Sequence, residues 1–292
     1  MKFAVNLPIL GEGYSDPKQL VELARDAEQA GWDAVYVWDS LLFDIGMHPP
    51  IADPWIVLAA IATATSRVQI GPMIAQLARR RPAKVARELV TLDHLSSGRV
   101  MCGVGLGFSG EAEFAQFGED STPKVRAAKL DEALAIITGL LTGEPFGFTG
   151  TYYHVAEGTV FLPRPVQPTI PIIVGGYWPN KGPFRRAARW DGTSPAEVER
   201  DEHGVFVGIH PTSPETVKTI STFIAERRTR TSPFAMIVSR VLPDDPTEAA
   251  DLIAAYAAAG TTSLMRDIMP WAEPIDAARA MIRRGPPRSS AV

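Results

Sequence analysis

The sequence predicts an α/β fold, an eight-stranded parallel (β/α)8 (TIM) barrel with one insertion after its fourth strand. Short apolar runs alternate with helical patterns along the chain, which indicates a parallel sheet. The first four predicted strands begin near residues 3, 34, 68 and 99, that is 31, 34 and 31 residues apart, the size of a βα unit. Eight such units and roughly 250 core residues favour a closed barrel over an open sheet. We therefore expect residues 1–292 to form a single domain.

The first unit shows how each element is recognised. Phe3–Leu7 is an apolar run that ends at Pro8, as a buried parallel strand would. Ser15 is the expected N-cap of a helix whose apolar residues recur at helical spacing until Gly31. By the same criteria, strands are predicted at 3–7, 34–38, 68–70, 100–104, 170–174, 190–193, 234–241 and 262–264. Helices are predicted at 17–30, 54–62, 82–95, 125–141, 184–189, 214–227, 246–259 and 274–284.

The insertion spans residues 109–168. After the helix at 125–141, the stretch GEPFGFTGTYYHV has the glycines and alternating aromatic residues of a β-hairpin. The following FLPRPVQPTIP has four prolines and predicts an extended surface segment. At the other end of the chain, GPPRSSAV at 285–292 has the composition of a frayed tail.

Composition excludes several classes of protein. A net charge of −4 offers no basic surplus for nucleic acid, and no apolar run is long enough to span a membrane. The first residues lack the features of a signal peptide, so we expect a cytoplasmic protein. The single Cys102 forms neither a disulfide nor a multi-cysteine zinc site, and the five histidines show no metal-ligand spacing, so no metal is expected.

In a barrel of this kind, the chemistry lies on the loops that follow the strands. Gly105-Leu106-Gly107 opens a G-x-G-x-x-G pattern after the fourth strand. A dinucleotide-binding fold would need an acidic residue after a following strand, yet the stretch KVRAAKLDEAL is helical, so that interpretation fails. The glycines then indicate either a tight turn or a ligand close to the backbone.

Three other strand ends carry candidate groups. Gly175-Gly176, before a predicted helix, is a candidate anion site or else a plain turn. Asp39 follows an apolar strand, where a carboxylate needs a donor, a ligand or an N-cap role. The run of arginines at 79–81 is expected to be a solvated rim.

Several segments together resemble one family, the luciferase-like flavin-dependent oxidoreductases and monooxygenases. The resembling segments are GWDAVYVWDS, RRPAKVARELVTLDHLSSGRVMCGVGLG, LPRPVQPTIPIIVGG and RRAARWDG. They occur in the family's order, clearly over residues 1–195 and more loosely beyond. The resemblance implies an eight-stranded barrel and a cofactor that is either FMN or the deazaflavin coenzyme F420.

The resemblance also implies where that cofactor would bind. Its ring would lie against residues of the second, third and fourth strand ends, and its phosphate against the fifth. The implied cofactor contacts are Asp39, Gly71, Met73, Ile74, Gly105, Leu106, Gly107, Gly175, Gly176 and Tyr177. A cis peptide bond is expected at Met73-Ile74, and the insertion at 109–168 is expected to cover the mouth of the site. The resemblance also implies that the protein forms a homodimer.

Two departures leave the proton-handling group undecided. Ser40 stands where many members have histidine, and Phe108 stands where several deazaflavin-dependent dehydrogenases have glutamate. Other acids and a histidine remain as replacements, namely Asp39, Glu111, Glu113 and His48. The candidate catalytic residues are Asp39, Ser40 and Glu111.

The sequence favours an enzyme that moves hydride or oxygen between a reduced flavin and a small organic substrate, with dioxygen as a candidate co-substrate. Aromatic residues near the strand ends indicate a mostly apolar substrate; they are Trp38, Trp55, Phe108, Tyr177 and Trp178. Two alternatives stay open: a non-catalytic flavin-binding protein, and a phosphate-sugar lyase or isomerase on the same barrel.

Overall fold

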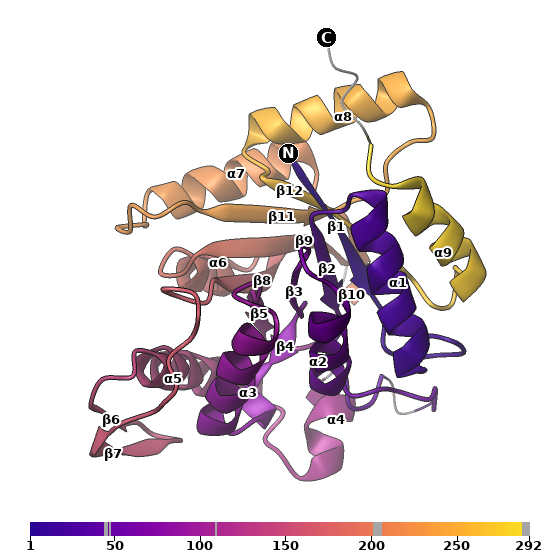
Figure 1. Cartoon of the computed structure of the whole chain (residues 1–292). Helices are drawn as coiled ribbons and strands as arrows, with labels where there is room; N and C mark the ends of the chain where they lie inside the picture. Colours follow the sequence, from indigo (N-terminus) through magenta and orange to yellow (C-terminus); the bar gives the residue numbers. More distant parts are fainter. Residues whose placement is uncertain (44–45, 47, 109, 201–205, 288–292) are drawn as a thin grey trace.

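The computed structural model describes residues 1–43, 46, 48–108, 110–200 and 206–287. Residues 288–292 of the predicted tail lie outside this range. The described chain is a parallel barrel surrounded by helices (Figure 1), which confirms the predicted fold class. The barrel strands follow one another in the order β3-β2-β1-β12-β11-β9-β8-β5-β4.

The elements alternate as the sequence predicts. The barrel strands are β1 (Lys2–Leu7), β2 (Ala34–Val37), β3 (Gln69–Pro72), β4 (Ala75–Gln76), β5 (Cys102–Gly105), β8 (Ile172–Trp178), β9 (Gly192–Arg200), β11 (Ala235–Ser239) and β12 (Ser263–Asp267). The helices are α1 (Pro17–Ala30), α2 (Pro54–Ala64), α3 (Pro82–Leu95), α4 (Gly110–Glu113), α5 (Pro123–Leu141), α6 (Lys181–Ala187), α7 (Pro214–Ala225), α8 (Pro246–Ala259) and α9 (Ile275–Arg284). Two 3-10 turns, η1 (Leu77–Arg79) and η2 (Ala115–Phe117), follow β4 and α4.

The third strand of the barrel is interrupted. β3 pairs with β2 and forms one bridge, Ile70 to Val100, toward the next strand. β4 then pairs with β5 through Ala75 and Gln76. β3 and β4 lie one after the other between β2 and β5 and together occupy one strand position of the barrel. The described barrel therefore has the eight strand positions predicted from the sequence.

Two sets of buried side chains follow from the alternation of residues along each strand. One set faces the helices and includes Val5, Val35 and Val104. The other is a smaller cluster inside the barrel that includes Ala4, Met265 and Ile237. Cys102 lies in the helix-facing set, is buried, and is a free thiol whose pKa burial raises to about 12. It is therefore a core residue.

The insertion after β5 packs mainly on the helical layer. Its hairpin, β6 (Phe146–Thr149) and β7 (His154–Thr159), lies beside α5 (Figure 1), where Glu132 accepts the backbone N–H groups of residues 151–153. The proline-rich segment then runs along α3, where Asp93 accepts the N–H groups of Val166 and Gln167 at 2.7 and 3.0 Å. These contacts place the later part of 109–168 on the outside of the barrel. The expectation that residues 109–168 cover the mouth of the site remains a prediction. The contacts of the later part of this insertion do not support it.

Some boundaries differ from the expected ones. Asp16, not Ser15, caps α1, because its side chain accepts the N–H of Lys18. The strand β10 (Phe206–His210) was not predicted; it pairs antiparallel with the extension of β9. None of the described helices combines the length and the apolar character needed to cross a membrane.

Candidate functional site

The chain forms a bulge between β3 and β4. The peptide bond from Met73 to Ile74 is cis, which confirms the expectation from the family resemblance. Met73 belongs to the interior cluster, whereas Ile74 is partly exposed. A Cβ placed on Gly175 would lie 1.8 Å from Ile74 Cδ1, and one placed on Gly105 would lie 3.0 Å from its Cγ2. The Ile74 side chain therefore lies between β5 and β8 and forms an apolar floor at the strand ends.

The glycines in this region make room for protein atoms. A Cβ on Gly71 would lie 1.7 Å from the carbonyl oxygen of Met101. A Cβ on Gly176 would lie 2.3 Å from Cβ of Pro183. Together with the packing around Ile74, these contacts explain the glycines without a bound ligand. Glycine content by itself is therefore not evidence for a ligand here. The expected contacts of these glycines with a cofactor stay predictions.

The candidate anion site does not have the expected backbone. β8 continues to Trp178, and Gly175 and Gly176 pair within the sheet with β9. Helix α6 begins only at Lys181. The expectation of a turn at a helix N-terminus is wrong, because the strand extends beyond its apolar run. Tyr177 lies in the same strand, and burial raises the pKa of its hydroxyl group.

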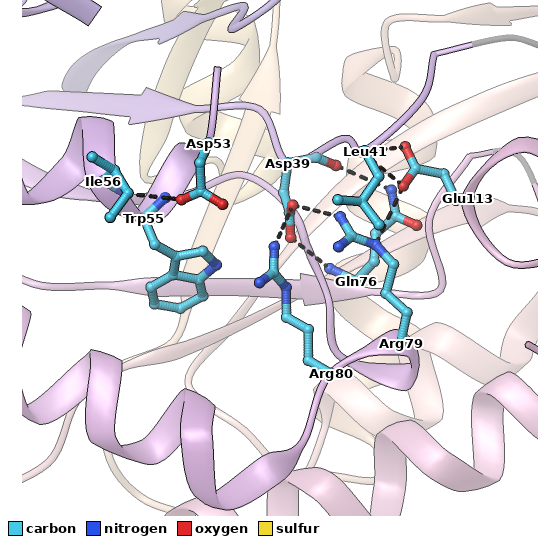
Figure 2. Close-up of polar contacts among 9 residues, drawn as sticks. All are labelled: Asp39, Leu41, Asp53, Trp55, Ile56, Gln76, Arg79, Arg80 and Glu113. Atoms are coloured by element: carbon cyan, nitrogen blue, oxygen red, sulfur yellow. Dashed lines mark hydrogen bonds and ion pairs between the residues drawn. The ribbon is translucent and has the colours of Figure 1, made fainter. Parts of the chain in front are cut away.

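Asp39 is buried within a cluster of charged side chains (Figure 2). Its Oδ1 accepts from Arg79 at 2.6 Å and from Arg80 at 2.8 Å. Its Oδ2 accepts from the backbone N–H of Gln76 at 3.2 Å. The three arginines at 79–81 were expected to form a solvated rim, and Arg81 is indeed exposed. The expectation is wrong for Arg79 and Arg80, whose side chains are only 4% and 15% exposed. Both are buried because they pair with the buried Asp39 carboxylate. Asp39 anchors the turn after β4, and its cofactor and catalytic roles stay predictions.

Glu113, which follows in α4, extends this cluster. Its carboxylate accepts the backbone N–H of Leu41 at 3.0 and 3.2 Å (Figure 2) and pairs with Arg79 at 3.2 Å. Burial raises the pKa of Glu113, against the lowering effect of the Leu41 bond, of Arg79 and of the Ser40 side chain. Ser40 thus binds a structural carboxylate. Glu111 is exposed and has no such contact among the described residues.

The loop after β5 folds against Gln76. Gly107 has a φ of +83°, and a Cβ there would lie 2.1 Å from Gln76 Oε1. The carbonyl oxygen of Leu106 accepts from Arg126 at 2.8 Å. Gln76 Nε2 donates to the carbonyl oxygen of Asp39 at 3.0 Å. The structure therefore joins the predicted Gly105-Leu106-Gly107 loop to the Asp39 cluster through one glutamine.

A second polar cluster, which sequence reasoning missed, lies at the ends of β1 and β12. Asn6 and Asp267 are register partners, and Asn6 Nδ2 donates to Asp267 Oδ1 at 2.6 Å. The same amide nitrogen lies 3.5 Å from the carbonyl oxygen of Met73, next to the bulge. The side chains of Ser239 and Trp38 also hydrogen-bond to Asp267.

Burial raises the pKa of Asp267, against the lowering effects of Ser239, Asn6 and Arg266. This carboxyl group is thus a candidate to exchange a proton beside the bulge. The predicted last strand stops at Leu264, three residues short of Asp267. Extending the alternation of inward and outward residues by three more residues would have found it.

The residues around the bulge fit the ring system of a flavin or deazaflavin. Ile74 supplies an apolar surface for a flat ring. Two buried side-chain oxygens, Oδ1 of Asn6 and Oε1 of Gln76, have no hydrogen-bond partner within the described part of the chain. Buried acceptors are normally satisfied, so Asn6 Oδ1 can accept an N–H of a ring that lies against the floor, whereas Gln76 Oε1 lies against the Gly107 backbone.

Comparisons with known proteins show what this chain is similar to. The family model described as luciferase-like monooxygenase matches residues 1–284. An F420-dependent glucose-6-phosphate dehydrogenase of Amycolatopsis mediterranei is 39% identical over 166 residues, which is 55% of this chain and 48% of the relative. The match thus spans about half the length of this curated relative.

Solved structures share the fold. A coenzyme F420-dependent tetrahydromethanopterin reductase from Methanopyrus kandleri has a TM-score of 0.72 at 17% identity, covering 97% of this chain and 96% of its own. A type II Baeyer–Villiger monooxygenase from Pseudomonas putida, in complex with FMN, has a TM-score of 0.71 at 16% identity, covering 97% of both chains. At these identities the likeness shows a common barrel.

Proposed function

Because the chain belongs to the luciferase-like monooxygenase family, we propose that it is an oxidoreductase that binds a flavin or deazaflavin at the carboxyl ends of its strands. The observation that carries the proposal is the Ile74 floor beside Asn6, whose buried Oδ1 has no hydrogen-bond partner within the described residues. When bound, such a cofactor supplies a ring that accepts or releases hydride. The chain itself positions the ring and a small organic substrate.

Of the two cofactors, we propose coenzyme F420 as the first to test. The relative at 39% identity is named as F420-dependent, whereas the FMN-bound neighbour is only 16% identical and shares the fold. FMN with dioxygen as co-substrate is the second arm of the same test. A flavin-binding protein without catalysis would bind a cofactor and turn over no substrate, so turnover excludes it.

The test is a titration of the purified protein with F420 and, separately, with FMN. We expect one of them to bind with a Kd below about 50 μM. Ile74→Glu places a charge on the floor and should weaken that Kd at least about tenfold, or 1.4 kcal/mol. The matched control is Ile56→Glu on α2, where the isoleucine is 69% exposed, and its Kd should equal that of the wild type. Failure of both cofactors to bind would overturn the proposal.

Two further expectations form part of the proposal. We propose a homodimer, which sedimentation at micromolar concentration would test, with a monomer as the contrary result. We also propose a cytoplasmic location, which the single buried thiol supports because it requires no oxidising compartment.

A further inference from the structure

A cavity lies on the outer, helix-facing side of the sheet and encloses about 220 Å³. Its lining residues come mainly from β1, β12, the segment after β11, and α9 with the residues that follow it. Helix α8 packs beside α7, whereas α9 packs beside α1 (Figure 1). None of the lining residues in the described chain belongs to α8, so this helix does not fill the space beside β12.

The base and walls of this cavity are mainly apolar. Phe3 of β1 and Leu264 of β12 are register partners and form its base. Leu242, after β11, and Met281, on α9, line the walls and are partly exposed. Sites for drug-sized molecules enclose roughly 300–1,000 Å³, so this smaller cavity suits a small ligand with an apolar part.

Two arginines lie side by side at one end of the cavity. Val238 of β11 and Leu264 of β12 are register partners, and both face the helices. Residues two apart on a strand face the same side, so Arg240 and Arg266 occupy the next outward positions on these two strands. The backbone N–H of Arg240 donates to the carbonyl oxygen of Met265 at 2.8 Å, which continues the pairing of the strands to this level.

Only one of these two charges has a counterion. Arg266 pairs with Glu273 at 2.6 Å. Arg240 forms no ion pair within the described part of the chain, and its buried Nε has no hydrogen-bond partner there. Like charges at neighbouring strand positions repel each other. The exposed Asp244 and Arg284, which also line the cavity, carry opposite charges, so the cavity keeps one cation in excess.

We propose that this cavity binds a small amphipathic anion, namely a carboxylate with an unbranched apolar chain. Its head group pairs with Arg240 and Arg266, because guanidinium groups present several N–H donors that match a carboxylate. Its chain lies on Phe3 and Leu264 and removes their apolar surface from water. The inference does not rest on the proposed function, because the Ile74 floor lies between β5 and β8, whereas this cavity lies on β1 and β12.

The test is a calorimetric titration of the purified protein with octanoate, for which we expect a Kd below about 1 mM. Acetate carries the charge without the chain, and 1-octanol carries the chain without the charge. Each of these two probes should bind at least about tenfold more weakly than octanoate, because each lacks one of the two contacts.

The variant Arg240→Gln removes the unpaired charge and should weaken octanoate binding at least about tenfold. The matched control is Arg185→Gln, the same change at an exposed arginine on α6, and its Kd should equal that of the wild type. Because Arg240→Gln also removes one of two like charges, it should not lower the free energy of unfolding without ligand, as measured by urea denaturation. A merely structural arginine would lower it.

A second readout reports the location of the ligand. Of the eight methionines, Met281 lines the cavity, so its methyl group should respond to octanoate. With ¹³C-methyl-labelled methionine, the Met281 resonance is assigned by its absence in Met281→Leu. It should shift on addition of octanoate in the wild type and not in Arg240→Gln at the same concentration. Met281→Glu places a carboxylate in the cavity and should abolish binding, which tests the inference if Arg240→Gln does not fold.

The outcomes decide both the site and the class of ligand. A Kd for octanoate above about 1 mM, an unchanged Kd in Arg240→Gln, or an unmoved Met281 resonance would each overturn the site. Binding of 1-octanol as tight as that of octanoate would overturn the anionic class. Failure of the wild type to bind F420 or FMN would overturn the proposed function and leave this inference standing.

Discussion

At the residue scale, the contacts of the predicted site residue Asp39 are those of a side chain that stabilises the fold. Its carboxylate is fully buried between Arg79 and Arg80, so removing it leaves Arg80 without its carboxylate partner and Arg79 with Glu113 alone. We expect Asp39→Ala to lower the free energy of unfolding by about 3–5 kcal/mol. Urea denaturation measures this, with Asp251→Ala on the exposed face of α8 as a control expected to stay within about 0.5 kcal/mol. Full stability with lost cofactor binding would instead favour direct contact with the cofactor.

The residue scale is also where prediction from sequence was least complete. Asp39 attracted attention because a carboxylate after an apolar strand needs a partner. Its partners Arg79 and Arg80 lie 40 and 41 residues further along the chain, and no local pattern joins them. The pairing of Asn6 with Asp267 spans 261 residues and depends on β1 and β12 being neighbours in the barrel. Such contacts follow from the closed topology, which has to be known first.

At the element scale, one side chain of α1 fixes the connection between α2 and β3. The carboxylate of Glu28 accepts the backbone N–H groups of Ser66, Arg67 and Val68 at 2.6 to 3.0 Å. Burial acts to raise the pKa of Glu28, but these backbone bonds outweigh it and lower the pKa below 4.5. The stabilisation is therefore present above the unfolded-state pKa and is lost as pH falls through the folded-state value.

This clamp gives a prediction with a defined pH dependence. Glu28→Gln keeps the shape of the side chain and removes its charge, so we expect it to cost about 1–3 kcal/mol at neutral pH. The difference from the wild type should shrink between neutral and acidic pH, as pH falls through the lowered pKa of the wild-type carboxylate. Urea unfolding at both pH values measures it, with Glu22→Gln on the exposed side of α1 as the control. A difference that does not change with pH would show that charge is not the cause.

Most elements could be predicted because each depends on a short local pattern. Helix starts at Pro54, Pro82, Pro214 and Pro246 are marked by proline, and their structural boundaries agree with the sequence. Strand ends were predicted less well. β8 and β12 continue past their apolar runs, to Trp178 and Asp267, because sheet pairing holds polar and glycine residues in the strands. Those extensions contain the residues on which the proposed site depends.

At the scale of the whole molecule, the ring of strands joins the two ends of the chain. β1 lies between β2 and β12, and α1 packs beside α9, so the N-terminal and C-terminal units complete one barrel. The regular βα spacing made this closure predictable. The proposed site uses both ends of the chain as well as the middle: Asn6 and Asp267 meet beside the bulge at Met73, which itself lies next to β5.

A ligand bound at this junction should therefore stabilise the barrel as a unit. A cofactor at about 100 times its Kd adds about 2.7 kcal/mol to the free energy of unfolding, which should raise Tm by roughly 5 °C. Thermal unfolding followed by circular dichroism, with and without F420 or FMN, measures the shift. Ile74→Glu should lose most of it at the same ligand concentration, because the variant weakens binding at the floor, whereas Ile56→Glu should keep it. An equal shift in Ile74→Glu and wild type would mean that the cofactor binds away from the bulge.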